Sequence, residues 1–288
     1  MGKFLFILLL FSSLAGAQSL RVREPLPSDN SSFAQWNTEF RTRYEGMPQA
    51  SRAGQSECRE FSRIPGTILC LTGSVADVGR YQGRASLFAE GAGVDATGVN
   101  VGKGQVVERN SITYATYSQN IGGTDIRSED LQRYYRSVGS HCQCACPTGE
   151  GCATGNYCLD ATEQEMYDRV IAPAEARNQP FVVIMAPYEY GIIVEHEVLH
   201  AQYFNDTAYR SAVDDFWANS MTTGERSSVT AALGDNYDRN DAYLIRNEFQ
   251  AYALKSEGSP FESISRTYRV RLMAHLAARG VQPVLLSQ

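Results

Sequence analysis

The chain of 288 residues is short of several features that would assign it to a common functional class. It contains only four histidines and two tryptophans, and its net charge of −6 comes with no concentrated basic stretch. Because nucleic-acid binding depends on clustered Lys and Arg side chains, nothing in the sequence favours a nucleic-acid partner. No segment after the first residues is long and apolar enough to cross a bilayer, so we expect no membrane anchor. The sequence does not indicate an oligomeric state.

The first seventeen residues have the pattern of a secretory signal peptide. Lys3 precedes an unbroken apolar run at residues 4–11, and small residues follow as far as Ala17. This run is well short of the roughly twenty residues that a transmembrane helix needs. Ala17 stands where a lipoprotein would carry its lipidated cysteine, so no lipid anchor is expected there. We therefore predict cleavage near Ala17 and a secreted or periplasmic protein.

Seven cysteines accompany this export signal, and exported proteins form disulfides. Cys58 and Cys70 flank a short segment and are candidates for one bridge. The other five lie in a segment rich in Gly, Thr and Pro: Cys142, Cys144, Cys146, Cys152 and Cys158. Their spacing differs from the paired C-x-x-C pattern of common zinc modules. We predict up to three structural disulfides, with one thiol left over, and no metal on these cysteines.

Periodicity along the rest of the chain predicts a mixture of helices and strands. An aromatic stripe predicts a helix at 33–46, and Gly-rich alternating runs at 66–124 predict strands, as at 67–72, 106–107 and 112–117. Thr162 and Glu165 form a predicted capping box that opens a helix to about residue 177. The β-rich run at 180–185 predicts a buried strand. Helices are then expected at these segments: 192–204, 207–221, 225–233, 241–255 and 261–278.

One short motif carries most of the chemical information. Residues 195–200 contain H-E-x-x-H, with His196 and His200 four positions apart in a predicted helix. At that spacing both imidazoles lie on one helical face and can bind one metal ion, about 2.0 Å from each nitrogen. Glu197 lies beside that face, where its carboxylate can accept a proton from water without binding the metal. The surrounding residues are mostly aliphatic, and buried imidazoles beside a buried glutamate need a strong partner such as a divalent cation.

A catalytic zinc ion needs a third protein ligand, and two positions are the main candidates. Asp206 lies six residues after His200, but a ligand so close requires a sharp turn at Tyr203, where a bulky side chain opposes the left-handed conformation. Glu248 lies on a later predicted helix, with Ala251 one turn on to permit close helix packing. We therefore predict Glu248 as the third ligand. The remaining alternatives are Asp235, Asp238, Asp241 and His275.

The motif at 196–200, followed at this distance by E-F-Q-A-Y-A at 248–253, resembles the gluzincin metallopeptidases. The similarity is to the catalytic domain of anthrax toxin lethal factor and its relatives, and it covers roughly residues 181–278. It implies that His196, His200 and Glu248 bind one zinc ion and that Glu197 is the general base. The narrow substrates of those toxins do not carry over, because nothing outside the catalytic half matches.

One position departs from this resemblance. The relatives carry a tyrosine seven residues before the glutamate ligand, where it stabilises the developing oxyanion, and Asp241 occupies that position here. We expect a neighbouring tyrosine to take the role. Tyr243 is the first choice, and Tyr237 and Tyr252 are the substitutes.

These observations predict an α+β protein whose catalytic half is mostly helical and zincin-like, with a small sheet. After the signal peptide at 1–17 we expect an N-terminal α+β region at 18–140, a Cys-rich loop at 141–160 and the catalytic domain at 161–288. The predicted function is zinc-dependent hydrolysis of a peptide or protein substrate, with the strand at 181–185 as an edge for substrate pairing. Two alternatives stay open: a cysteine-stapled binding or structural module with a non-catalytic metal, and a zinc amidase acting on cell-wall peptides.

Overall fold

The computed structural model describes residues 20–91, 101–108, 123–144, 157–234, 237–255 and 261–286. The predicted signal peptide at 1–17, the predicted strand at 112–117 and the candidate ligand Asp235 lie outside these ranges. Cys146 and Cys152 lie outside them as well.

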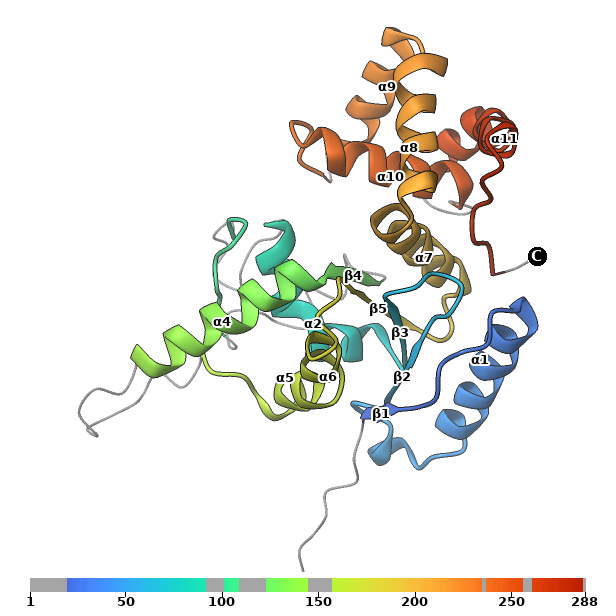
Figure 1. The fold of residues 1–288 in the computed structure, drawn as a ribbon. Coiled ribbons are helices and arrows are strands. Elements are labelled where there is room, and N and C mark those ends of the chain that lie inside the picture. Colours follow the sequence, from blue (N-terminus) through green and yellow to red (C-terminus); the bar gives the residue numbers. More distant parts are fainter. Residues whose placement is uncertain are drawn as a thin grey trace, which may run out of the picture.

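A five-stranded mixed sheet organises the fold, and its strands come from both halves of the sequence (Figure 1). In spatial order the strands are β1 (Leu20–Val22), β2 (Ser56–Glu60), β3 (Thr67–Thr72), β5 (Val182–Pro187) and β4 (Thr124–Arg127). The β1/β2 and β3/β5 pairs are parallel, whereas β2/β3 and β4/β5 are antiparallel. Because β5 lies between two strands that precede it, the boundary predicted at residue 160 passes through one sheet.

The position of β5 contradicts one prediction. We expected the strand at 181–185 to form an edge, but β5 is hydrogen-bonded to β3 on one side and to β4 on the other. All six of its residues are buried. A continuous apolar run of this kind is typical of a strand covered on both faces. The edge strand of the described sheet on this side is therefore β4.

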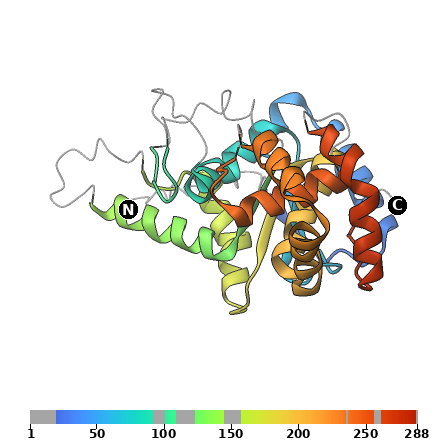
Figure 2. The same ribbon diagram turned by 90° about the horizontal axis from the view of Figure 1, so that it is seen from above.

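Helices cover both faces of the sheet (Figures 1 and 2). One face packs against α2 (Val75–Glu90), α4 (Ser128–Cys144), α5 (Ala161–Met166), the π-helix Tyr167–Ile171 and α6 (Ala172–Glu175). The opposite face packs against α1 (Asn30–Glu45) and α7 (Gly191–Asn205). Alternate residues of β5 divide between these cores, with Val183 and Met185 in the first and Val182 and Ile184 in the second.

The chain after α7 adds a helical layer with its own core, seen in orange and red in Figure 1. It comprises α8 (Thr207–Asp215), the π-helix Phe216–Ser220, α9 (Thr223–Leu233), α10 (Ala242–Leu254) and α11 (Glu262–Ala278). The helices predicted from residue 192 onward are thus confirmed, and so is the α+β fold class. None of the described helices is long and apolar enough to span a bilayer.

The strands predicted within 66–124 are confirmed only in part: β3 matches the predicted strand at 67–72, whereas α2 occupies residues 75–90. The Ser74 side chain caps this helix at its start, and Gly91, with a left-handed φ of 66°, ends it. Gly79 and Gly83 lower the intrinsic helix propensity and obscured the pattern. Four buried residues nevertheless recur at helical spacing: Val78, Tyr81, Ala85 and Phe88. The predicted strand at 106–107 is not a strand either.

Two disulfides join described residues. Cys58 and Cys70 lie directly opposite each other on β2 and β3, and their predicted bond is confirmed. Cys142 and Cys158 connect the end of α4 to the segment before α5. Because α4 runs to Cys144, the predicted Cys-rich loop begins inside a helix.

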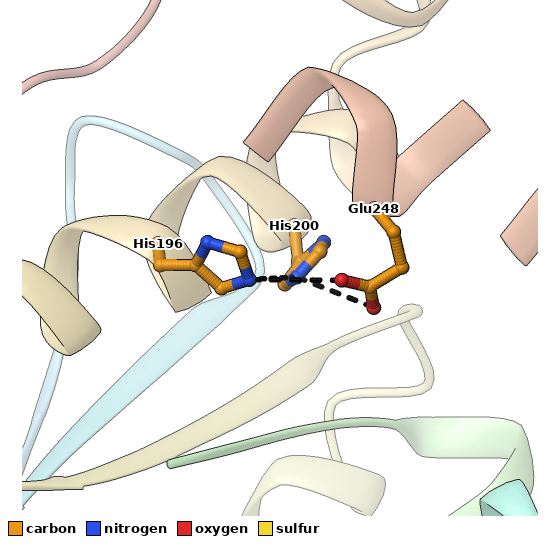
Figure 3. A group of neighbouring side chains, drawn as sticks. All are labelled: His196, His200 and Glu248. Carbon is orange, nitrogen blue, oxygen red and sulfur yellow. Dashed lines mark hydrogen bonds and ion pairs between the residues drawn. The ribbon is translucent and has the colours of Figure 1, made fainter. Parts of the chain in front are cut away.

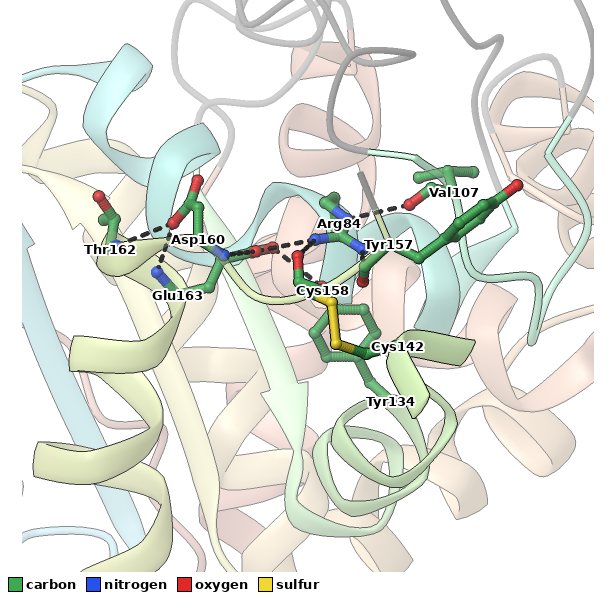
Figure 4. A network of polar contacts seen from close by, with 9 residues as sticks. All are labelled: Arg84, Val107, Tyr134, Cys142, Tyr157, Cys158, Asp160, Thr162 and Glu163. Carbon is green, nitrogen blue, oxygen red and sulfur yellow. Dashed lines mark hydrogen bonds and ion pairs between the residues drawn. A yellow bond between two sulfur atoms is a disulfide. The ribbon is translucent and has the colours of Figure 1, made fainter. Parts of the chain in front are cut away.

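A buried ionic network fixes the segment before α5 (Figure 4). The Arg84 guanidinium donates to Glu163 Oε2 at 2.8 Å, and the Tyr134 hydroxyl donates to Glu163 Oε1 at 2.9 Å. Arg84 also donates to three backbone carbonyl oxygens, those of Val107, Tyr157 and Cys158. These bonds tie α2, α4 and α5 together and leave the Glu163 carboxylate fully paired.

The capping box predicted in this region is displaced by two residues. Asp160 is the N-cap of α5, and Glu163 completes the box three residues later. Glu165 instead accepts a hydrogen bond from the Leu20 backbone and pairs with Arg169.

Candidate metal centre

Helix α7 lies between the sheet and the C-terminal helices, which explains why it is apolar on two faces. Val194, Val198 and Ala201 pack into the core that the sheet shares with α1, whereas Leu199 and Tyr203 pack into the C-terminal helical core. Successive residues of a helix are separated by about 100°, so a third face remains. That face carries three residues: His196, Glu197 and His200.

The two imidazoles of this face converge on Glu248, which extends from α10 (Figure 3). His196 Nε2 and His200 Nε2 are 3.1 Å apart. Glu248 Oε2 lies 3.7 Å from His196 Nε2, and Glu248 Oε1 lies 3.6 Å from His200 Nε2. His200 and Glu248 are buried and His196 is nearly so. The three residues predicted as ligands are therefore brought together by two helices that are far apart in sequence.

These separations suit a small tetrahedral cation. Ligand atoms about 2.0–2.1 Å from a tetrahedral zinc ion lie about 3.3–3.4 Å from one another, close to the three observed distances. His196 Nδ1 lies 3.4 Å from the Lys255 carbonyl oxygen, which can only accept, so the tautomer with the proton on Nδ1 leaves a lone pair on Nε2. Lone pairs and a carboxylate thus face one point, which is the donor set that a metal requires.

Glu197 lies on the side of His200 that faces β4. Ligand atoms of Asp125, Glu197 and His200 all lie within 4.8 Å of one another, and the two carboxyl groups hydrogen-bond. Asp125 is partly buried on β4, and Glu197 is buried at 7% exposure. Glu197 therefore borders the triad without belonging to the same group of three ligand atoms.

Burial and mutual repulsion control ionisation in this acidic cluster. Burial raises the pKa of Glu197 well above its usual range, and Asp125 and Glu248 add to the effect. Burial also raises the pKa of Asp125 to about 6, with His200 opposing the shift. Burial disfavours the charged forms of His200 and Glu248, but their attraction raises the pKa of His200 and lowers that of Glu248. A divalent cation would relieve the repulsion among the carboxylates.

Two of the three candidate tyrosines lie against the triad. The Tyr252 ring centroid is 4.4 Å from that of His196, and the Tyr252 and Tyr237 hydroxyls are 2.8 Å apart. Tyr237 also hydrogen-bonds to Glu248. Tyr243, the first choice from sequence, stacks on Phe204 with ring centroids 6.2 Å apart. The oxyanion role of Tyr243 stays a prediction, and the contacts favour the two substitutes.

The other candidate ligands have different structural roles. Asp206 is the N-cap of α8 and accepts a hydrogen bond from Tyr209 N at 3.0 Å. Asp241 caps α10, and Asp238 accepts a bond from the Asn240 backbone. His275 lies on α11, where its Nε2 is 3.1 Å from a carboxylate oxygen of Asp215. None of these contacts involves the His196–His200–Glu248 triad.

Sequence reasoning missed Asp125 as a neighbour of the triad. The only sign of this in the local sequence is the alternation of buried and less buried residues in β4. Thr124 and Ile126 face the core on one side of the sheet, and Asp125 faces α7 on the other. The antiparallel pairing of β4 with β5 was not predicted, and without it nothing brings Asp125 near Glu197.

Comparison with known proteins assigns no family to this arrangement. No protein-family model matches the chain, and neither a curated protein nor a solved structure matches it.

Proposed function

We propose that the protein is a secreted zinc-dependent metallopeptidase. The observation that carries the proposal is the convergence of two histidine nitrogens and the Glu248 carboxylate on one buried point. Three protein ligands leave the fourth position of a tetrahedral ion open, as catalytic zinc sites require. The disulfides between described residues agree with export to an oxidising compartment.

The residues around this point supply the remaining groups for hydrolysis. A zinc ion, when bound, supplies Lewis acidity that lowers the pKa of water toward neutrality. Glu197 is the general base, because its carboxylate is buried beside the ligands and outside the triad. After the water has attacked the peptide carbonyl carbon, Glu197 passes the proton to the leaving amine. Because Tyr237 gives its one hydroxyl proton to Glu248, the Tyr252 hydroxyl, 2.8 Å from that of Tyr237, is the donor for the oxyanion.

An extended peptide fits the sheet beside this site. β4 is the edge strand in the described part of the sheet, and α7 packs against β4 where Asp125 meets Glu197. A substrate strand adding to the edge of β4 that pairs with no other described strand would form main-chain hydrogen bonds without regard to its side chains. This supports peptide bonds as the substrate, including those of a cell-wall peptide.

The proposal is tested by metal analysis and hydrolysis of a fluorogenic unfolded protein with the purified mature chain. We expect one zinc ion per chain, loss of hydrolysis with 1,10-phenanthroline and its return on adding zinc. Glu197→Gln should retain zinc and lower kcat by about 10²- to 10⁴-fold, since the amide keeps the shape but loses the base. Loss of zinc in that variant would make Glu197 a ligand and would contradict its role.

The same sample separates the enzyme from a module in which metal only braces the helices. A structural zinc ion has four protein ligands, whereas a catalytic one keeps a position for water. X-ray absorption at the zinc edge should give two imidazoles, one carboxylate and one light solvent ligand. A fourth protein side chain on the metal would favour the structural role.

A further inference from the structure

The proposed reaction gives no role to the Asp125 side chain on β4, which lies beside Glu197. Asp125 and Glu197 hydrogen-bond through their carboxyl groups, with His200 in the same group of atoms. Asp125 lies on β4, which pairs with β5, and α7, which carries Glu197, packs against both strands. The contact is therefore set by the sheet rather than by α7 alone.

The backbone of the same strand segment also touches Glu197. A Cβ atom built on Gly123 would lie 2.9 Å from Glu197 Cγ, 2.9 Å from Glu197 Oε1 and 2.9 Å from Ile193 Cγ2. Nonbonded carbon atoms in contact are normally about 3.5–4.0 Å apart, so any side chain at this position would displace Glu197. The absence of a side chain at Gly123 lets the chain pass directly behind the carboxyl group. Glu197 is thus bounded by backbone on one side and by Asp125 on another.

We infer that Asp125 is a positioning residue for Glu197. It holds the Glu197 carboxyl group from the side of β4, so that this group stays next to the triad. This inference rests on the proposed function. A glutamate side chain has three rotatable bonds, and fixing them before the reaction removes an entropic cost from the catalytic step. Asp125 acts through Glu197, so its effect should vanish when Glu197 can no longer act as a base.

Binding of acetohydroxamic acid to the cobalt-substituted full mature chain tests this without turnover. The probe gives its proton to a neighbouring base as it binds the metal, and the visible absorption of Co²⁺ reports its dissociation constant. We expect Asp125→Ala to weaken binding by about tenfold to a hundredfold, the usual effect of removing a residue that orients an active-site group. Asp125→Asn should restore most of the loss, since its amide can still hydrogen-bond. Glu129→Gln is the matched control. It also removes one negative charge, but from an α4 side chain that is 64% exposed.

The decisive comparison is with the variant that lacks the base. The double variant Asp125→Ala with Glu197→Gln should bind the probe no more weakly than Glu197→Gln alone. Independent, additive losses would overturn the inference, and so would equal binding by Asp125→Ala and Glu129→Gln. A fall from two metal ions per chain to one in Asp125→Ala would instead make Asp125 a ligand of a second ion. If the wild-type chain hydrolyses no peptide, the proposed function fails, but these binding constants still decide the role of Asp125.

Discussion

Two buried charge clusters in this protein use the same kinds of group but differ in how completely they are paired. Around Glu163 the protein itself supplies every partner: the Tyr134 hydroxyl, the Arg84 guanidinium and a backbone amide of the capping box (Figure 4). Around Glu248 it does not. Glu248 Oε2 is buried with no hydrogen-bond partner among the described residues, and imidazole nitrogens face the same point (Figure 3).

This difference in pairing separates a structural cluster from a candidate functional one. Shifted pKa values do not, because burial raises the pKa of Glu163 as it raises that of Asp125. Native proteins pair nearly all buried polar groups, so a buried carboxylate oxygen with no hydrogen-bond partner among the described residues, next to two imidazoles, indicates a missing ligand. The following predictions change one cluster at a time and ask whether function or stability responds.

The largest effect is expected from removing the predicted third ligand. Glu248→Ala should weaken zinc binding by more than about 100-fold, because losing even a supporting partner of a ligand costs tenfold to a hundredfold. Asp206→Ala is the control, since it removes an acid close in sequence that caps α8. It should keep zinc and lose only about 1 kcal/mol of stability. Competition with a chromogenic zinc chelator measures both affinities.

The reverse result would overturn the proposed ligand set. If Asp206→Ala loses zinc and Glu248→Ala keeps it, the gluzincin resemblance fails, although the H-E-x-x-H motif would still support a peptidase.

Breaking the paired cluster should affect stability and leave the metal site alone. Arg84→Met leaves the buried Glu163 carboxylate without its cation and should lower the free energy of unfolding by about 3–5 kcal/mol. Replacing both residues, as Arg84→Met with Glu163→Gln, should cost much less because no charge is stranded. Urea unfolding measures stability, and zinc affinity should be unchanged in both variants. Zinc loss would mean that the two clusters are coupled.

The metal-site half of this comparison was largely predictable from sequence. The spacing of His196 and His200 fixes their common helical face, and Glu248 was chosen because a second helix can cross the first without a strained turn. Both arguments depend on local helix geometry. The confirmed helices of the C-terminal layer follow from the same periodicity.

Features that depend on strand pairing were not predictable in this way. The inner position of β5 and the approach of β4 to α7 are set by contacts between segments far apart in sequence. Asp125 could not be recognised without them. α2 was missed for a different reason, since Gly79 and Gly83 weakened a helical pattern that tertiary packing restores.

A smaller effect, a gain in stability rather than the loss expected for Arg84→Met, should follow from neutralising Asp125 at the metal site. The pKa of Asp125 is raised from 3.8 to about 6, so the folded chain holds its proton to higher pH than the unfolded chain does. Ionising it therefore reduces stability as pH rises through this range. In metal-free protein at about pH 7.5, Asp125→Asn should gain roughly 1–2 kcal/mol, less than the full shift implies because the side chain is partly exposed.

The gain should disappear at about pH 4, where Asp125 is protonated in the folded chain. Thermal unfolding of chelator-treated protein at both pH values tests this, with Glu129→Gln as the control that should show no gain. A destabilised Asp125→Asn at about pH 7.5 would mean that the site carboxylates do not repel one another.

The smallest effect is expected at a surface ion pair that belongs to neither cluster. Glu225, in the first turn of α9, pairs with Arg271 of α11, and the hydrogen bond from Arg271 lowers the Glu225 pKa to about 2. A lowered pKa contributes stability above 4.5, the ordinary value, and that stability is lost as pH falls toward about 2. Glu225→Gln should therefore lower Tm slightly at neutral pH, more weakly in high salt, and not at all near pH 2.

Glu262→Gln, which breaks an exposed pair within α11, is the matched control. An equal fall in Tm at both pH values would mean that the effect does not come from the charge of Glu225.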